Sequence, residues 1–124
     1  MSDIFQEIHE FEESRRVALR AVGDGHARLS VDGICEMTGF EREIVGESLR
    51  EMAIAGELEV VFVVSSPHSH APVMTVSRVE DIPYSQLLSD QDGAQFMVSP
   101  ADVDVVYEAS LELRLLSERL AAAA

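Results

Sequence analysis

Arg42 and Arg50 are the side chains of this sequence whose type and spacing best suit recognition chemistry. A guanidinium is a planar fork of N–H donors that can bond two acceptors at once, as on a guanine edge or a phosphate. In a helix, a spacing of eight residues places both forks on similar sides, about two turns apart. Two uses stay open for the pair: binding an external acceptor, or ion pairing with the Glu residues around them.

His68 and His70 lie in a loop rich in Ser and Pro and are the other candidates for binding. Two His residues supply at most two metal ligands, whereas zinc sites use three or four protein ligands. The single cysteine, Cys35, lies in an apolar segment and is expected to pack as a small hydrophobic residue. The sequence contains no Gly-rich phosphate loop, no Gly-x-Ser-x-Gly motif and no paired-Cys motif. We therefore expect no metal, no cofactor and no enzymatic activity.

The segments that would position these side chains are helices followed by a hairpin. Apolar spacing predicts helices over about 2–22, with Ser2 as the N-cap, over 30–38, with Ser30 as the N-cap, and over about 41–55. Gly39 supplies the positive φ that a tight turn between two helices needs. Two β-branched runs, 58–64 and 73–79, enclose the turn-rich loop 65–72. This order predicts two helices joined by a tight turn and followed by a β-hairpin.

Residues 80–98 show few signals of secondary structure. A strong signal for the start of a helix follows them. Ser99 suits an N-cap and Pro100 suits the first helical position. Apolar residues then recur at spacings of three and four, and they include Val106, Leu113, Leu116 and Leu120. Such a seam predicts a helix over 99–124 that packs either on a second copy or on its own domain.

The charge balance of the chain is extreme. Asp and Glu number 23 against 9 basic residues, all of them Arg, and the net charge is −14. The acids are interleaved with apolar residues along the chain, which argues against a disordered acidic tail. An acidic surface for a partner is one explanation. Adaptation to molar salt is the other, because 1 M salt screens charge repulsion within roughly 3 Å. The absence of Lys beside scattered acids resembles proteins of salt-in halophilic archaea.

Targeting signals are not evident in the sequence. The N-terminal stretch MSDIFQEIHEFEE is acidic where a signal peptide would be basic, and no window approaches 18 uninterrupted apolar residues. A single cysteine forms no intramolecular disulfide, as is typical of a reducing compartment. We expect a soluble cytoplasmic protein that does not bind membranes.

Residues 30–64 carry a framework of apolar and small residues around a Thr-Gly turn. The framework positions are Ile34, Cys35, Thr38, Gly39, Val45, Leu49, Met52, Gly56 and Leu58. This framework resembles that of winged helix-turn-helix transcriptional regulators. The resemblance implies an α+β fold with three helices and a β-hairpin wing over 1–79, a linker over 80–98 and an additional, dimerising C-terminal helix over 99–124.

The resemblance also implies a function, sequence-specific binding of double-stranded DNA by a homodimer. The helix over about 41–55 would lie in the major groove and the wing, 65–72, near the backbone. The implied DNA contacts are Thr38, Arg42, Gly46, Arg50, His68 and His70. The implied dimer contacts are Val106, Leu113, Leu116 and Leu120.

The sequence departs from the pattern of that family on the surface that would meet DNA. Gly46 and Glu47 stand where many such regulators have Arg, Lys, Gln or Asn, and the wing contains no Arg. The alternative function is therefore a winged-helix module for protein–protein contact without DNA binding. In that case the acidic helix 41–55 would meet the partner through Glu41, Glu43, Glu47 and Glu51.

Overall fold

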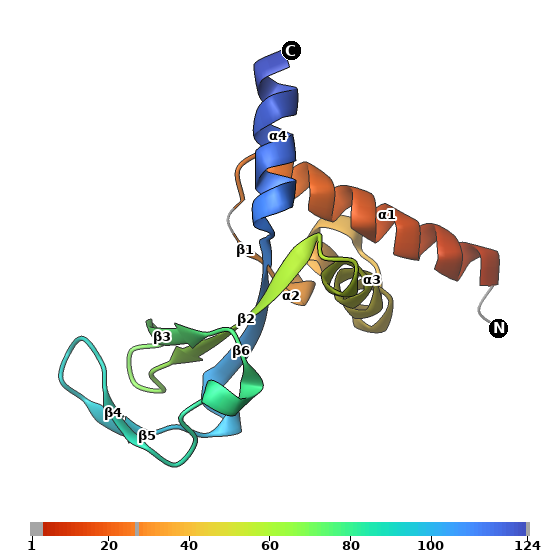
Figure 1. Cartoon of the computed structure of the whole chain (residues 1–124). Coiled ribbons are helices and arrows are strands. Elements are labelled where there is room, and N and C mark those ends of the chain that lie inside the picture. The colour runs from red at the N-terminus through yellow and green to blue at the C-terminus, as the bar shows by residue number, and fades with distance from the viewer. Residues whose placement is uncertain (1–3, 27, 124) are drawn as a thin grey trace. The chain divides into compact units, whose positions relative to one another are not determined.

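The computed structural model describes residues 4–26 and 28–123. In chain order, the elements are α1 (Ile4–Gly23), β1 (Arg28–Leu29), α2 (Val31–Thr38), α3 (Arg42–Ile54), β2 (Leu58–Ser65), β3 (Pro72–Val76), the 3-10 turn η1 (Val79–Asp81), β4 (Leu87–Ser89), β5 (Gln95–Met97), the 3-10 turn η2 (Pro100–Asp102), β6 (Val103–Ala109) and α4 (Leu111–Ala123) (Figure 1). The described residues thus form four α-helices, an antiparallel sheet of order β1-β6-β2-β3 and a β4–β5 ribbon. The fold is α+β and is compatible with a winged-helix-like arrangement.

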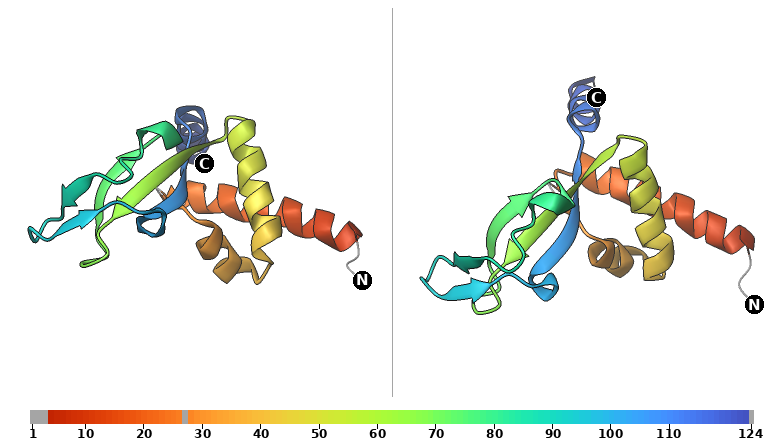
Figure 2. Two further views of the ribbon diagram at one scale, coloured as in Figure 1. Left: turned by 90° about the horizontal axis from the view of Figure 1, so that it is seen from below. Right: turned by 60° about the horizontal axis from the view of Figure 1, so that its bottom comes forward.

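The chain divides into two compact units, Met1–Glu59 with Tyr107–Ala124, and Val60–Val106. In the first unit, α1 packs against both α2 and α3 (Figures 1 and 2). The hydroxyl of Ser48 on α3 donates a hydrogen bond to the carbonyl oxygen of Phe11 on α1 at 2.9 Å. The residues buried in this unit include Ala18, Val22, Ile34, Val45, Leu49 and Met52.

The corner between α2 and α3 has the geometry predicted from the sequence. The hydroxyl of Ser30 accepts a hydrogen bond from the amide of Gly33 at 3.0 Å and so caps α2. Gly39 has a φ of 76° and its amide donates to the carbonyl of Cys35 at 2.7 Å. The expected N-cap at the start of α2 and the expected positive φ at the corner are both confirmed. Ser2, the expected cap of α1, lies outside the described residues.

The second unit contains a β-hairpin and its own core. Strands β2 and β3 pair in antiparallel register, with Val64 opposite Met74. Residues 80–98, expected to be irregular, include the β4–β5 ribbon, in which Leu88 lies opposite Phe96. Phe96 packs with Val64, Ile82 and Val98 in a buried cluster. Hydrophobic burial therefore orders a segment whose strands, three residues each, are too short to give a clear sequence signal.

The expected helix over 99–124 is wrong in its first half. Ser99 and Asp102 form a capping box, but the helical turn that they start is only the three-residue η2. The chain then continues as strand β6, which contains Val103, Val105 and Val106. β-branched side chains favour an extended backbone, and β6 also gains pairing with β1. Val106 therefore lies on a strand and not on the C-terminal helix.

The C-terminal helix begins eleven residues later than the sequence signal indicated, at Leu111. Its N-terminus is capped by Ser110, whose hydroxyl accepts a hydrogen bond from the amide of Leu113 at 3.1 Å. The amide of Ser110 itself donates to the carbonyl of Glu57 at 3.0 Å. These bonds fix the start of α4 within the first unit. In the described part of the chain, no helix has both the length and the hydropathy to cross a membrane.

Candidate nucleic-acid interface

The exposed basic and acidic residues of α3 lie on two different sides of the helix. Successive helical residues turn by about 100°, so residues four apart lie on one side of a helix. One side, which we call the arginine edge, consists of Arg42, Gly46 and Arg50. The side next to it, which we call the glutamate edge, consists of Glu43, Glu47 and Glu51. The structure thus gives α3 two chemically different exposed surfaces.

The arginine edge borders a shallow hollow of about 290 Å³ that also contacts Tyr107 of β6. The side chains of Arg42 and Arg50 are 68% and 65% exposed. Arg42 forms an ion pair with Asp32 on α2, and a guanidinium nitrogen of Arg50 lies 3.9 Å from Glu47. Exposed ion pairs contribute at most about 1 kcal/mol, so a phosphate or a guanine can replace these carboxylates at little cost.

Thr38 uses its hydroxyl group inside the corner between α2 and α3. The hydroxyl donates to the carbonyl of Ile34 at 2.8 Å and accepts from the amide of Phe40 at 3.2 Å. This residue therefore holds the turn that precedes α3. The hydroxyl of this expected DNA contact is thus bonded within the protein.

Gly46 lies between the two arginines on the same edge, and a Cβ atom added there has open space. Gly costs a helix interior about 0.8–1 kcal/mol relative to Ala. We therefore expect Gly46→Ala to raise the free energy of unfolding by up to about 1 kcal/mol, measured by urea denaturation in molar KCl. The matched control is Gly56→Ala, which should lower it because Gly56 has a φ of 81°. If Gly46→Ala instead destabilises the fold, the space around residue 46 is not free to accept a methyl group.

His68 and His70 lie in the loop between β2 and β3, which belongs to the second unit, whereas Arg42 and Arg50 belong to the first. Both histidines are exposed, and Nε2 of His68 lies 3.3 Å from the carbonyl oxygen of Gln95. This contact ties the loop to β5. The structure thus places the two groups of expected DNA contacts in separate units.

The loop is anchored by Ser66 and Asp90, a pair that the sequence analysis did not identify. The buried hydroxyl of Ser66 donates to a carboxylate oxygen of Asp90 at 2.8 Å. The same hydroxyl accepts from the amide of His68 at 3.1 Å. No sequence pattern links the two residues, which are 24 positions apart. The pair fixes the conformation of the expected wing tip.

The hydrogen bond from Ser66 lowers the pKa of Asp90 below its ordinary value of 3.8. Burial opposes this shift, while the amides of Ala94 and Asp92 and the charge of His68 support it. A carboxylate with a lowered folded pKa stabilises the fold above its unfolded pKa, and this stabilisation is lost as the pH falls through the folded value.

We therefore expect the stability of the chain to fall below about pH 4 more steeply than that of Asp90→Asn, which has no carboxylate to protonate at this position. The measurement is the urea midpoint as a function of pH. Asp92→Asn is the matched control because the side chain of Asp92 is exposed, and its pH profile should follow that of the unmodified chain. Parallel profiles for Asp90→Asn and the unmodified chain would contradict the anchoring role.

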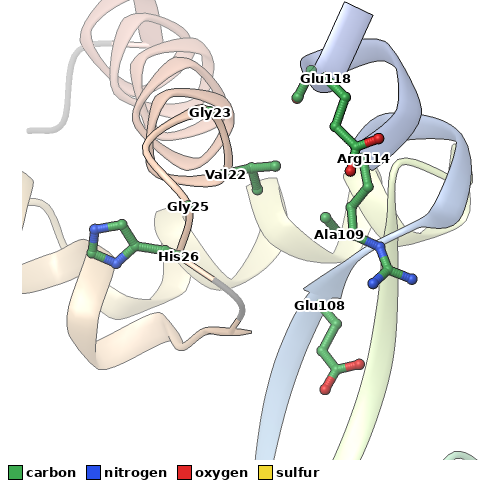
Figure 3. A pocket seen from close by; sticks show the side chains of 9 residues that line it. Val22, Gly23, Gly25, His26, Glu108, Ala109, Arg114 and Glu118 are labelled. Atoms are coloured by element: carbon green, nitrogen blue, oxygen red, sulfur yellow. The ribbon is translucent and has the colours of Figure 1, made fainter. Parts of the chain in front are cut away.

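A second hollow of about 440 Å³ lies in the first unit, where the end of α1 meets β6 and α4. Figure 3 shows Arg114 extending past Ala109 in the direction of Glu108, whereas His26 points away from them. Glu108 also forms an ion pair with Arg28 at 2.9 Å. The charged side chains that line this hollow therefore do not all point toward one another.

The C-terminal helix α4 exposes leucines on two sides. Leu116 and Leu120 are exposed and lie on the same side as the half-buried Leu113. Leu111 and Leu115 form another exposed apolar side. Three of the four expected dimer contacts, Leu113, Leu116 and Leu120, thus share one side of α4.

Metal ligands and the single cysteine are the other candidates for binding chemistry in this chain. No group of three or more His, Cys, Asp or Glu residues there is placed to hold a metal ion. Cys35 is a free thiol and is half-buried rather than fully buried. Comparisons of this chain with known protein families, with curated proteins and with solved structures find no match.

Proposed function

We propose that this chain is a winged helix-turn-helix protein of the cytoplasm that binds double-stranded DNA sequence-specifically, as a homodimer, in transcriptional regulation. Helix α3 would enter the major groove and the 65–72 loop would lie near the backbone. The observation that carries the proposal is the arginine edge of α3. It presents two exposed guanidinium forks on a helix that follows the turn at Gly39.

The acidity of the chain fits this function if the protein works in molar salt, as we propose from its composition. High salt weakens phosphate contacts, because each counterion that binding releases then gains less entropy on entering the concentrated solution. Contacts to base edges do not depend on counterion release in the same way. A regulator with few basic residues and two bidentate forks would therefore gain its binding energy mainly from base recognition.

Dimerisation would come from the side of α4 that carries Leu113, Leu116 and Leu120. A two-fold dimer presents two copies of α3 to half-sites about 34–36 Å apart along the duplex. The proposal therefore predicts a DNA site with two-fold symmetry. It also predicts that the dimer, not the monomer, is the binding species.

The test is a selection of duplexes from a randomised pool by the full chain in molar KCl. The expected result is enrichment of a two-fold-symmetric motif. The same selection with Arg42→Ala/Arg50→Ala should return the starting pool. Recovery of the same motif by that variant would contradict the role of the arginine edge.

A second candidate function is protein binding without DNA binding. Two observations favour it, namely the acidic partners of both arginines and the continuous glutamate edge of α3. A selection that enriches no motif, from a chain that is folded and dimeric, would favour this candidate over the first.

A further inference from the structure

An apolar groove runs between α1 and α3 in the first unit. Its floor is formed by Ile4, Ile8 and Phe11 of α1 and by Ile44 of α3, around a hollow of about 430 Å³. Ile4 and Ile8 are 64% and 50% exposed, while Phe11 and Ile44 are half-buried. The groove is therefore a continuous apolar stripe that the described part of the chain leaves in contact with solvent.

The rim of this groove is acidic on both sides. Glu7 and Glu12 of α1 and Glu47 of α3 line it. Within the described residues, neither Glu7 nor Glu12 has a salt-bridge partner. The one basic residue that lines the adjoining surface, Arg15, is already paired with Glu57 at 2.6 Å. An occupant would therefore meet three carboxylates, of which Glu47 has Arg50 near it at 3.9 Å.

The groove continues past Phe11 and Glu47, which also line a neighbouring hollow of about 440 Å³. This neighbouring hollow, which is not the one near Arg114, extends along the glutamate edge to Glu51. From Ile4 to Arg15 the α1 wall is about 16 Å long at 1.5 Å per residue, which corresponds to about three turns of helix. Helix α3 crosses α1 (Figure 2), so this length lies along α1, and an apolar stripe of this length on a helix suits a short helical segment.

From this geometry we propose that the α1–α3 groove binds a basic amphipathic helix of another protein. Apolar side chains at i, i+3 or i+4 and i+7 would cover the floor, and Arg or Lys beside them would pair with the rim. A second copy of this chain offers few partners for the rim, because the chain has 9 basic residues against 23 acidic ones. Nucleic acid is repelled by the same carboxylates.

The groove faces α1, whereas the arginine edge lies on another side of α3, and the two share only Glu47, which lies 3.9 Å from Arg50. The proposal therefore does not rest on DNA binding, and the two can fail independently. Arg42→Ala should leave binding in the groove unchanged, and Ile8→Asn should leave the DNA motif unchanged, because neither variant alters the Arg50–Glu47 pair.

The experiment measures the binding of two synthetic peptides to the full chain by fluorescence anisotropy. Both peptides are amphipathic helices of about four turns with the same leucine stripe. One has Arg and the other has Glu at the flanking positions. The KCl concentration is the lowest at which circular dichroism shows the chain folded, because salt screens charge pairing. We expect the Arg peptide to bind and the Glu peptide not to bind.

Two groove variants and one control locate the site. Ile8→Asn should weaken binding of the Arg peptide roughly tenfold or more by removing an apolar contact. Glu7→Gln/Glu12→Gln/Glu47→Gln should weaken it by about fivefold. The control, Glu36→Gln/Glu59→Gln/Glu112→Gln, removes the same charge from exposed positions outside the groove and should have little effect.

Three results would overturn the proposal. Equal weakening by the groove and control triple variants would show that only net charge attracts the peptide. Equal binding of the Glu peptide would show that the partner is not basic. Sedimentation measures self-association of the chain and of Ile8→Asn. If Ile8→Asn abolishes self-association, the groove binds a second copy of the chain.

Discussion

Replacing both Arg42 and Arg50 with Ala is expected to weaken binding of the selected duplex by roughly thirtyfold or more in molar KCl. The reason is that each bidentate contact of an arginine with a guanine contributes about 1–3 kcal/mol. The fold should be unaffected, because both side chains are exposed and their ion pairs are on the surface. The measurement is a titration of labelled duplex with the full chain.

The matched control for this effect is Arg78→Ala/Arg119→Ala. It removes the same charge from two other exposed arginines, neither of which lies on α3. Its affinity should stay close to that of the unmodified chain. Equal losses in the two double variants would mean that positive charge alone, and not the arginine edge, holds the DNA.

The second large effect is expected on the oligomeric state. Leu116→Ala/Leu120→Ala should raise the dissociation constant of the dimer by roughly a hundredfold or more, because burial of each leucine contributes about 1.5–3 kcal/mol. The change should not unfold the first unit, since both side chains are exposed in the single chain. Sedimentation equilibrium at several protein concentrations measures it.

Leu111→Ala/Leu115→Ala is the control for the dimer, since it shortens two exposed leucines on another side of the same helix. This variant should dimerise like the unmodified chain. If Leu111→Ala/Leu115→Ala dissociates and Leu116→Ala/Leu120→Ala does not, the dimer uses the opposite side of α4. If neither dissociates, α4 is not the interface.

Helices α1, α2 and α3 and the first hairpin strand could be predicted because their signals are local. Ser30, Gly39 and the apolar spacing of α3 act within a few residues of the backbone that they control. Such signals are present in the sequence itself. The corner that presents Arg42 and Arg50 is therefore the part of the candidate interface that sequence reasoning predicts best.

Strand β6 and the Ser66–Asp90 pair could not be predicted in the same way, because distant partners decide them. Ser99 and Pro100 are a genuine local signal for the start of a helix, and one helical turn forms there. The chain then continues as a strand, because three β-branched valines favour an extended backbone and β6 pairs with β1. Likewise, Asp90 gains its role only when folding brings Ser66 beside it. The separation of charge on α3 was available from the sequence, by assigning residues 42–51 to angular positions on a helix.

The central claim, sequence-specific DNA binding, is tested most directly by genome-wide DNA occupancy of the tagged chain in the cells that express it. Cellular salt is preserved in this measurement, so the acidic chain stays under its working conditions. The proposal predicts discrete peaks that share a two-fold-symmetric motif and disappear with Arg42→Ala/Arg50→Ala. A flat profile from a folded, expressed chain would contradict it.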